Sequence, residues 1–179
     1  VAVKQELACR FIASEVALGR QTLQSLPQET REDPRVVLAA VQRDASHFGK
    51  VSEELRADRS FLLKALAKNG AVFQQLPPEL RRDPEMLLAG LKNDCRILKE
   101  APSNLLCDRD FVLRAVSLAG NALSYAASDL QQDRSLVLAA VSNDGSALRH
   151  ASPALKKDPT IQRVAAKQNS SFLRRLVEQ

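Results

Sequence analysis

The sequence predicts an all-α protein built as an α-solenoid, a superhelix of about seven repeats of 25 residues. An aspartate recurs at this unbroken spacing, at Asp33, Asp58, Asp83, Asp108, Asp133 and Asp158. Apolar residues follow each aspartate at helical spacing, and no alternating pattern indicates a strand. A fixed period of this size is typical of stacked helical repeats. The pattern describes how the chain is built, and it indicates no function beyond binding. What the protein binds must depend on the residues that differ between repeats.

Each repeat is predicted to begin with a longer helix that the aspartate caps. A carboxylate at this place accepts hydrogen bonds from free backbone amides and favours the positive end of the helix dipole. Proline suits the first helical position because its missing N–H costs nothing there, and it follows the aspartate at Pro34, Pro84 and Pro159. The apolar residues after the cap form a wide buried face, as in Phe61, Leu62, Ala65 and Leu66.

The second half of each repeat is predicted to be a short helix and then a one-turn connector. The longer helices are expected to end in a left-handed C-cap, at Asn69-Gly70, Ala119-Gly120 and Asp144-Gly145. The short helix is expected to bury Phe48, Phe73, Leu98, Leu123 and Leu148. The connector is expected to carry inward Leu55, Leu80, Leu105, Leu130 and Leu155.

A small residue recurs at the eighth position of each repeat, counted from the aspartate. The residues are Ala40, Ala65, Gly90, Ala115, Ala140 and Ala165. Packed helices approach to roughly 8–10 Å, and small side chains fit at such a crossing. The longer helices of neighbouring repeats are therefore predicted to pack directly against one another.

Residues 1–179 are predicted to form one solenoid domain. Residues 33–157 make five regular repeats, and residues 8–32 make a degenerate first repeat that begins at Ala8. This first repeat keeps the apolar pattern of the core, at Phe11, Ile12, Val16, Leu23 and Leu26.

Residues 158–179 are predicted to form a capping repeat. Gln162 and Arg163 stand at positions that are apolar in every regular repeat, and a terminal repeat needs a polar outer face. A polar tract at residues 167–171 is expected to precede a final helix from Phe172, with the array ending near Gln179.

Composition places the chain among globular proteins of mixed charge. Hydrophobic residues make up 45% and charged residues 26%, which excludes a disordered chain. The formal net charge of +5 allows an acidic partner, but acids and bases are interspersed, so the chain is not a basic tail.

The cysteines and the ends of the sequence bear on the compartment. Cys9, Cys95 and Cys107 are odd in number and match no ligand spacing, so they are predicted to be reduced thiols in an intracellular compartment. No apolar run is long enough for a membrane span. No initiator methionine or signal segment is present, which leaves open the cytoplasm or an organelle reached after removal of a targeting segment.

The repeat resembles a known family. Residues 133–152, with the sequence DRSLVLAAVSNDGSALRHAS, and the sister segment from Asp108 are similar to tandem units of the domain of unknown function 4116. The resemblance covers residues 33–157 well and both ends weakly. It implies a scaffold, an adaptor or an accessory subunit of a larger assembly, and it implies no enzymatic activity. Similarity to other helical solenoids, at the level of fold alone, suggests a right-handed superhelix.

Catalytic and metal chemistry are weighed against a structural role. Stacked aspartate caps would lie one layer apart, too far to share a metal ion, so capping is the preferred interpretation. His47 is expected to be half-buried and His150 exposed, and neither has a ligand partner at suitable spacing. The sequence has no phosphate-binding loop, nucleophile elbow or zinc-protease motif. We therefore expect no enzyme, cofactor, metal or small-molecule substrate.

Three arginines directly follow a capping aspartate, at Arg59, Arg109 and Arg134. A cation in the first turn opposes the helix dipole. These arginines are therefore predicted to pair with an acidic group or a helix C-terminus in the adjacent repeat.

The favoured function is binding of a protein partner, which could be part of a multisubunit complex, on exposed positions that vary between repeats. The candidate residues are Arg43, Lys64, Lys68, Lys92, Arg114, Leu118, Lys99, Tyr125 and Arg149. Tyrosine and arginine are frequent hot-spot residues of protein interfaces.

Binding of nucleic acid or another anionic surface is the alternative. RNA-binding repeats stack bases on exposed aromatic rings. Here only Tyr125 is expected to be exposed, because all phenylalanines stand at core positions: Phe11, Phe48, Phe61, Phe73, Phe111 and Phe172. Nonspecific phosphate binding by the basic candidates stays possible.

Overall fold

The computed structural model describes the backbone of residues 2–177, with the side chains of residues 7–22 and 24–168. Helices make up 78% of the structure, and the described backbone contains no strand, so the predicted all-α class is confirmed. The predicted core residues Leu23 and Phe172 lie outside the described side chains. The chain forms two compact units, residues 1–93 and 94–179, and each is described by itself.

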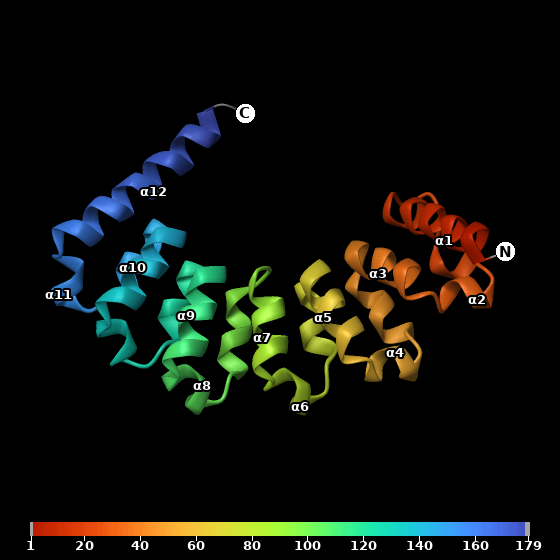
Figure 1. The fold of residues 1–179 in the computed structure, drawn as a ribbon, viewed down its shortest axis with the longest axis horizontal. Helices are drawn as coiled ribbons and strands as arrows, with labels where there is room; N and C mark the ends of the chain where they lie inside the picture. The colour runs from red at the N-terminus through yellow and green to blue at the C-terminus, as the bar shows by residue number, and fades with distance from the viewer. Residues whose placement is uncertain (1, 178–179) are drawn as a thin grey trace. The chain divides into compact units, whose positions relative to one another are not determined.

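In the first unit, the longer helices lie side by side in chain order from α1 to α7 (Figure 1). Short helices alternate with them. The elements are α1 (Ala2–Ala17), η1 (Leu23–Ser25), α2 (Gln28–Arg31), α3 (Pro34–Arg43), η2 (Ala45–Lys50), α4 (Glu53–Ala57), α5 (Arg59–Lys68), η3 (Gly70–Gln75), α6 (Pro78–Arg81) and α7 (Pro84–Leu91), where η denotes a 3-10 helix.

The second unit follows the same alternation. Its elements are η4 (Cys95–Glu100), α8 (Ser103–Cys107), α9 (Arg109–Leu118), η5 (Gly120–Tyr125), η6 (Leu130–Gln132), α10 (Arg134–Asn143), η7 (Gly145–His150), α11 (Pro153–Lys156) and α12 (Pro159–Val177). The longer helix, the short helix and the connector thus follow one another as the sequence predicts, and the short helix is of the 3-10 type.

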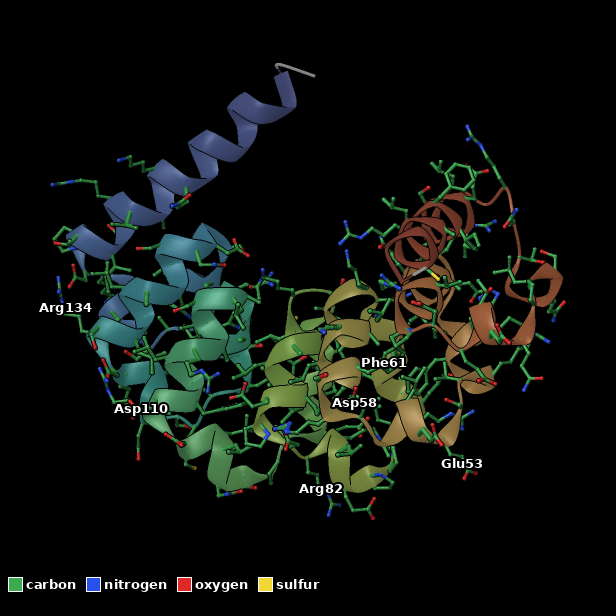
Figure 2. All side chains as sticks on the ribbon, turned by 45° about the vertical axis from the view of Figure 1, so that its right-hand side comes forward. Glu53, Asp58, Phe61, Arg82, Asp110 and Arg134 are labelled. Carbon is green, nitrogen blue, oxygen red and sulfur yellow. The ribbon has the colours of Figure 1, made fainter. Side chains whose placement is uncertain are left out.

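The core is built by the apolar residues of the longer helices. Figure 2 labels Asp58 at the start of α5 and Phe61 just after it, where the buried face begins. The small residues at the eighth position of each repeat, from Ala40 to Ala165, are all buried. The connector leucines are only half-buried, which corrects their predicted inward position. A connector of a single turn lies at the edge of the core and leaves one side of each leucine open to solvent.

The longer helices end in an extended residue, and the predicted left-handed cap is wrong. Asn69 has φ −148° and ψ 104°, and Ala119 and Asp144 have similar angles. Within residues 2–177 a positive φ occurs only at Gly19. The extended residue instead begins the 3-10 helix, as when Asn69 Oδ1 accepts from the Ala71 N–H at 3.1 Å. A new helix that starts at once makes a left-handed turn unnecessary.

The glycines after these residues serve close packing between repeats. A Cβ added to Gly120 would lie 2.5 Å from the carbonyl oxygen of Ala140 and 2.8 Å from Cβ of Asp144. A Cβ added to Gly70 would lie 2.5 Å from Cβ of Asn93. Real Cβ atoms do not approach other atoms so closely, so no larger residue fits without movement of the backbone.

The first repeat departs from its prediction at α1. This helix runs through Ala8 without a break, so the repeat has no capped start there. Ile12, Ala13 and Val16 pack against α3, whereas Phe11 lies outside this contact and is 65% exposed. Phe11 was expected in the core because its repeat position is buried in every later repeat. The contact with α3 does not reach it.

The last repeat contains one long helix instead of two. α12 continues through the polar tract at residues 167–171, so the expected separate helix from Phe172 is part of α12. Gln162 and Arg163 are exposed, in agreement with the polar face that the sequence predicts. Asn169 and Ser170 stand where earlier repeats change from the α-helix to the 3-10 helix, and α12 continues through these positions.

We expect Gly120→Ala to destabilise the fold by about 1–3 kcal/mol, because the added methyl group collides with the backbone of Ala140. Gly49→Ala is the matched control, since its Cβ would meet only Gln75 Oε1 at 3.8 Å. Urea unfolding followed by circular dichroism measures both variants. Equal stability of the two variants would show that close packing at Gly120 is not the reason for glycine.

Candidate functional site

The recurring aspartates are helix caps in the structure. Each carboxylate accepts a hydrogen bond of 2.8–2.9 Å from the backbone N–H two residues later, donated by Arg35, Ser60, Glu85, Asp110, Ser135 and Thr160. These bonds satisfy amides that a helix start leaves without partners. The carboxylates are therefore already used by their own helices.

The three arginines that follow an aspartate pair with the aspartate of the next repeat, as the sequence predicts. Arg59 Nη2 lies 3.0 Å from Asp83 Oδ1. Arg109 Nε and Arg134 Nε each lie 2.8 Å from an Oδ2 atom, of Asp133 and Asp158 respectively. Arg134 projects from the start of α10 (Figure 2). These pairs join neighbouring repeats at one edge of the helices.

Arginine contacts and hydrogen bonds make these carboxyls stronger acids. The Arg35 side chain holds the pKa of Asp33 down to about 2. The Ser135 hydroxyl and the Arg109 guanidinium lower the pKa of Asp133, and Arg134 lowers the pKa of Asp158. In each case the hydrogen bonds favour the charged form. The carboxylates thus stay ionised at neutral pH and are poor candidates for proton transfer.

Side-chain amides make a second connection between repeats. Asn69 Nδ2 donates to the Val41 carbonyl at 2.9 Å, and Asn93 Nδ2 donates to the Leu66 carbonyl at 3.1 Å. Asn143 and Gln168 make the same contact with Ser117 and Ser142. Helix ends leave carbonyls without partners, and these amides supply the donors. The sequence prediction missed this role, although an Asn or Gln at the eleventh or twelfth position of four repeats was a usable signal.

The candidate partner-binding residues fall in both units. The first unit holds Arg43 at the end of α3, Lys64 in the middle and Lys68 at the end of α5, and Lys92 directly after α7, and all four are exposed. The second unit holds Lys99 on η4, Arg114 and Leu118 on α9, Tyr125 on η5 and Arg149 on η7. The structure therefore groups the four basic residues of the first unit on consecutive helices. Arg43 also lines a hollow of about 420 Å³ together with His47, Gln21 and Thr22.

Two candidates of the second unit, Tyr125 and Arg149, are less available to a partner than the sequence predicts. Tyr125 is half-buried, which corrects the prediction of an exposed ring, and burial raises its pKa. Arg149 is exposed but donates from Nε to His150 Nε2 at 2.9 Å and from Nη2 to Asn121 Oδ1 at 3.3 Å. His150 is half-buried, not exposed, and burial lowers its pKa. His47 is half-buried as predicted.

Within the described residues, no group of three or more His, Cys, Asp or Glu side chains is arranged to hold a metal ion. Cys9, Cys95 and Cys107 are free thiols. Burial and the neighbouring Asp33 raise the pKa of Cys9. Among the helices that the structure describes, none combines the length and apolar character needed to cross a membrane.

The model of one protein family matches most of the repeat region. This family is described as a domain of unknown function (DUF4116), and it matches residues 33–81, 83–131 and 133–176. The chain belongs to the DUF4116 family. Each match extends over about two of the 25-residue repeats, so the family unit is a pair of DUF4116 repeats. Comparisons with curated proteins and with solved structures found no significant match.

We expect the two roles of the DUF4116 aspartate to be separable at Asp133. Asp133→Asn keeps an N-cap but loses the pair with Arg109, at a cost of up to ~1 kcal/mol. Asp133→Ala loses the cap as well and should cost ~1 kcal/mol more. Urea unfolding of both variants, alone and with Arg109→Ala, gives the coupling between the two residues. Fully additive effects of Asp133→Asn and Arg109→Ala would contradict the pairing.

We expect acid to weaken the first unit through Asp33. Its folded pKa of about 2 lies below 3.8, the usual pKa of an aspartate, so its stabilising effect is present above pH 4 and disappears as the pH falls toward 2. Asp33→Asn should reduce the loss of unfolding free energy over this pH window. Urea titrations at stepwise pH provide the measurement. An unchanged pH slope in Asp33→Asn would assign the acid sensitivity to other carboxyls.

Proposed function

We propose that this DUF4116 protein is a non-enzymatic scaffold that binds a protein partner. Its repeats would form an α-solenoid of about seven 25-residue units with a right-handed superhelix, and the variable exposed residues would contact the partner. A role as an adaptor or accessory subunit of a larger intracellular assembly fits this architecture.

The difference between the recurring positions, which make internal contacts, and the variable exposed positions supports this proposal. The polar residues that recur in every repeat are occupied internally, as the six aspartates are by backbone amides. The exposed residues that remain differ from repeat to repeat: the positions of Arg43, Lys64, Lys68 and Lys92 hold, among others, alanine, serine, asparagine, glutamine, leucine or another basic residue in other repeats. A surface of identical repeats would recognise nothing in particular, so variation among exposed positions is the feature that suits a binding surface.

Binding of nucleic acid or an anionic surface is the second candidate, because the same basic residues could contact phosphates. Such binding depends on counterion release, and its affinity falls steeply and log-linearly with salt. A protein interface with a desolvated centre depends much less on ionic strength. Salt therefore separates the two candidates.

We expect affinity capture with the tagged full chain, after nuclease treatment, to retain one protein in stoichiometric amount at high salt. Mass spectrometry identifies the protein, and reconstitution with the purified partner in a calorimeter tests direct binding. A second capture with an excess of untagged chain is the control, because it should displace the partner. Recovery of nucleic acid alone, lost as salt rises, would instead support the second candidate.

A further inference from the structure

The C-terminal halves of α3, α5 and α7, with the residues directly after them, share a set of positions that holds bases but no acids. The seventh, tenth and eleventh positions of a repeat lie within about 100° of one another around a helix, so they share one side. In these three repeats the positions hold Ala39, Gln42, Arg43, Lys64, Ala67, Lys68, Ala89, Lys92 and Asn93. We call Arg43, Lys64, Lys68 and Lys92 the basic face. The nearby Asp44 is engaged, since its carboxylate accepts from the Ser46 N–H at 2.8 Å.

The lysines of the basic face make no hydrogen bond or ion pair with the described residues, although the charge of Lys64 acts on the carboxylate of Asp58. Elsewhere in the first unit, Arg35 pairs with Asp33, and Arg59 pairs with Asp83. By contrast, no hydrogen bond or ion pair joins Lys64, Lys68 or Lys92 to any residue that the structure describes. Lys64 and Lys68 also stand four residues apart on α5, where like charges disfavour the helix. Folding alone does not explain this arrangement, whereas binding of an acidic ligand does.

The spacing of the helices indicates the shape of that ligand. α3, α5 and α7 lie side by side (Figure 1), and packed helices are roughly 8–10 Å apart. An extended polyproline II segment advances about 3.1 Å per residue with three residues per turn. One turn therefore spans about 9 Å, close to the distance between neighbouring helices. An acidic residue at every third position would meet one helix after another.

A protein segment fits this face better than a nucleic acid. Proteins that hold single strands stack bases on aromatic side chains, and the nine positions include no aromatic residue. The basic groups are mostly lysines, which act as point charges and lack the planar fork with which arginine grips phosphate. The face is thus suited to separate carboxylates.

We propose that the basic face binds an extended acidic segment of a protein partner, with acidic residues at every third position. This inference rests on the proposed function and adds the chemistry of the partner to it. Charge complementarity supports the proposal, since four bases lie on or beside three consecutive helices and the nine positions of this face hold no acid.

Fluorescence anisotropy with the full chain tests this proposal. The probe is a labelled peptide of tandem Glu-Pro-Ser triplets, and the comparison peptide has the same composition with its glutamates clustered at one end. We expect the spaced peptide to bind about fivefold more tightly or better, and Lys64→Glu with Lys68→Glu to weaken it by about tenfold or more. Lys50→Glu is the matched control, because Lys50 is an exposed lysine on η2 in the same unit. Circular dichroism verifies that all variants are folded.

Four outcomes would overturn the proposal. Equal affinity for the spaced and clustered peptides would show general charge attraction without recognition of spacing. Equal loss of binding in the Lys50→Glu control would have the same meaning. Tighter binding of an oligothymidylate than of either peptide, abolished by Lys64→Glu with Lys68→Glu, would assign the face to nucleic acid. Retention of a captured native partner by that double variant would reject the basic face while leaving the proposed scaffold function intact.

Discussion

The aspartate at the start of each longer helix is the group on which the repeat structure depends, because it caps its own helix and, at Asp83, Asp133 and Asp158, also pairs with an arginine of the preceding repeat. In Asp133, Oδ1 accepts from the backbone amides of Ser135 and Leu136, while Oδ2 accepts from Arg109 of the preceding repeat. The first contact fixes where the helix begins. The second fixes how that start lies against its neighbour. A strict spacing of this residue therefore sets the helix boundaries and the register between repeats together.

Proline and arginine after the aspartate give the repeats different connections. Where Pro34 follows the aspartate in place of an arginine, the Asp58 carboxylate accepts from the backbone N–H and the hydroxyl of Ser60 in its own helix. That pair of repeats is joined instead by the amide of Asn69 on the Val41 carbonyl. The next pair, with Arg59 and Asn93, has both connections. The amide connection therefore occurs both with the arginine pair and without it.

Predictions from the sequence were confirmed where they depend on interactions within a single helix. The cap of Asp58 and the burial of Phe61 follow from local geometry and helical spacing. The partner of Arg59 was predictable because an exposed cation at a helix start is unfavourable without one. The reason for Gly70 was not, since the sequence suggested a left-handed turn while the structure shows contact with Asn93. A contact between repeats is invisible in a single repeat. The predicted burial of Phe11 was wrong for a related reason. Its burial depends on contact with a neighbouring helix, and the contact between α1 and α3 does not include it.

The place of Lys68 in the basic face follows from a shift of one residue in the amide connection. In three repeats the residue at the eleventh position, Asn93, Asn143 or Gln168, donates to a carbonyl of the preceding longer helix. In the repeat that begins at Asp58, Asn69 performs this task from the twelfth position. The eleventh position of this repeat is then not needed for the connection. Lys68 occupies it and makes no hydrogen bond or ion pair with the described residues. Because Asn69 makes the connection to the preceding helix from the twelfth position, the eleventh position of the same repeat can carry a residue that contacts a partner.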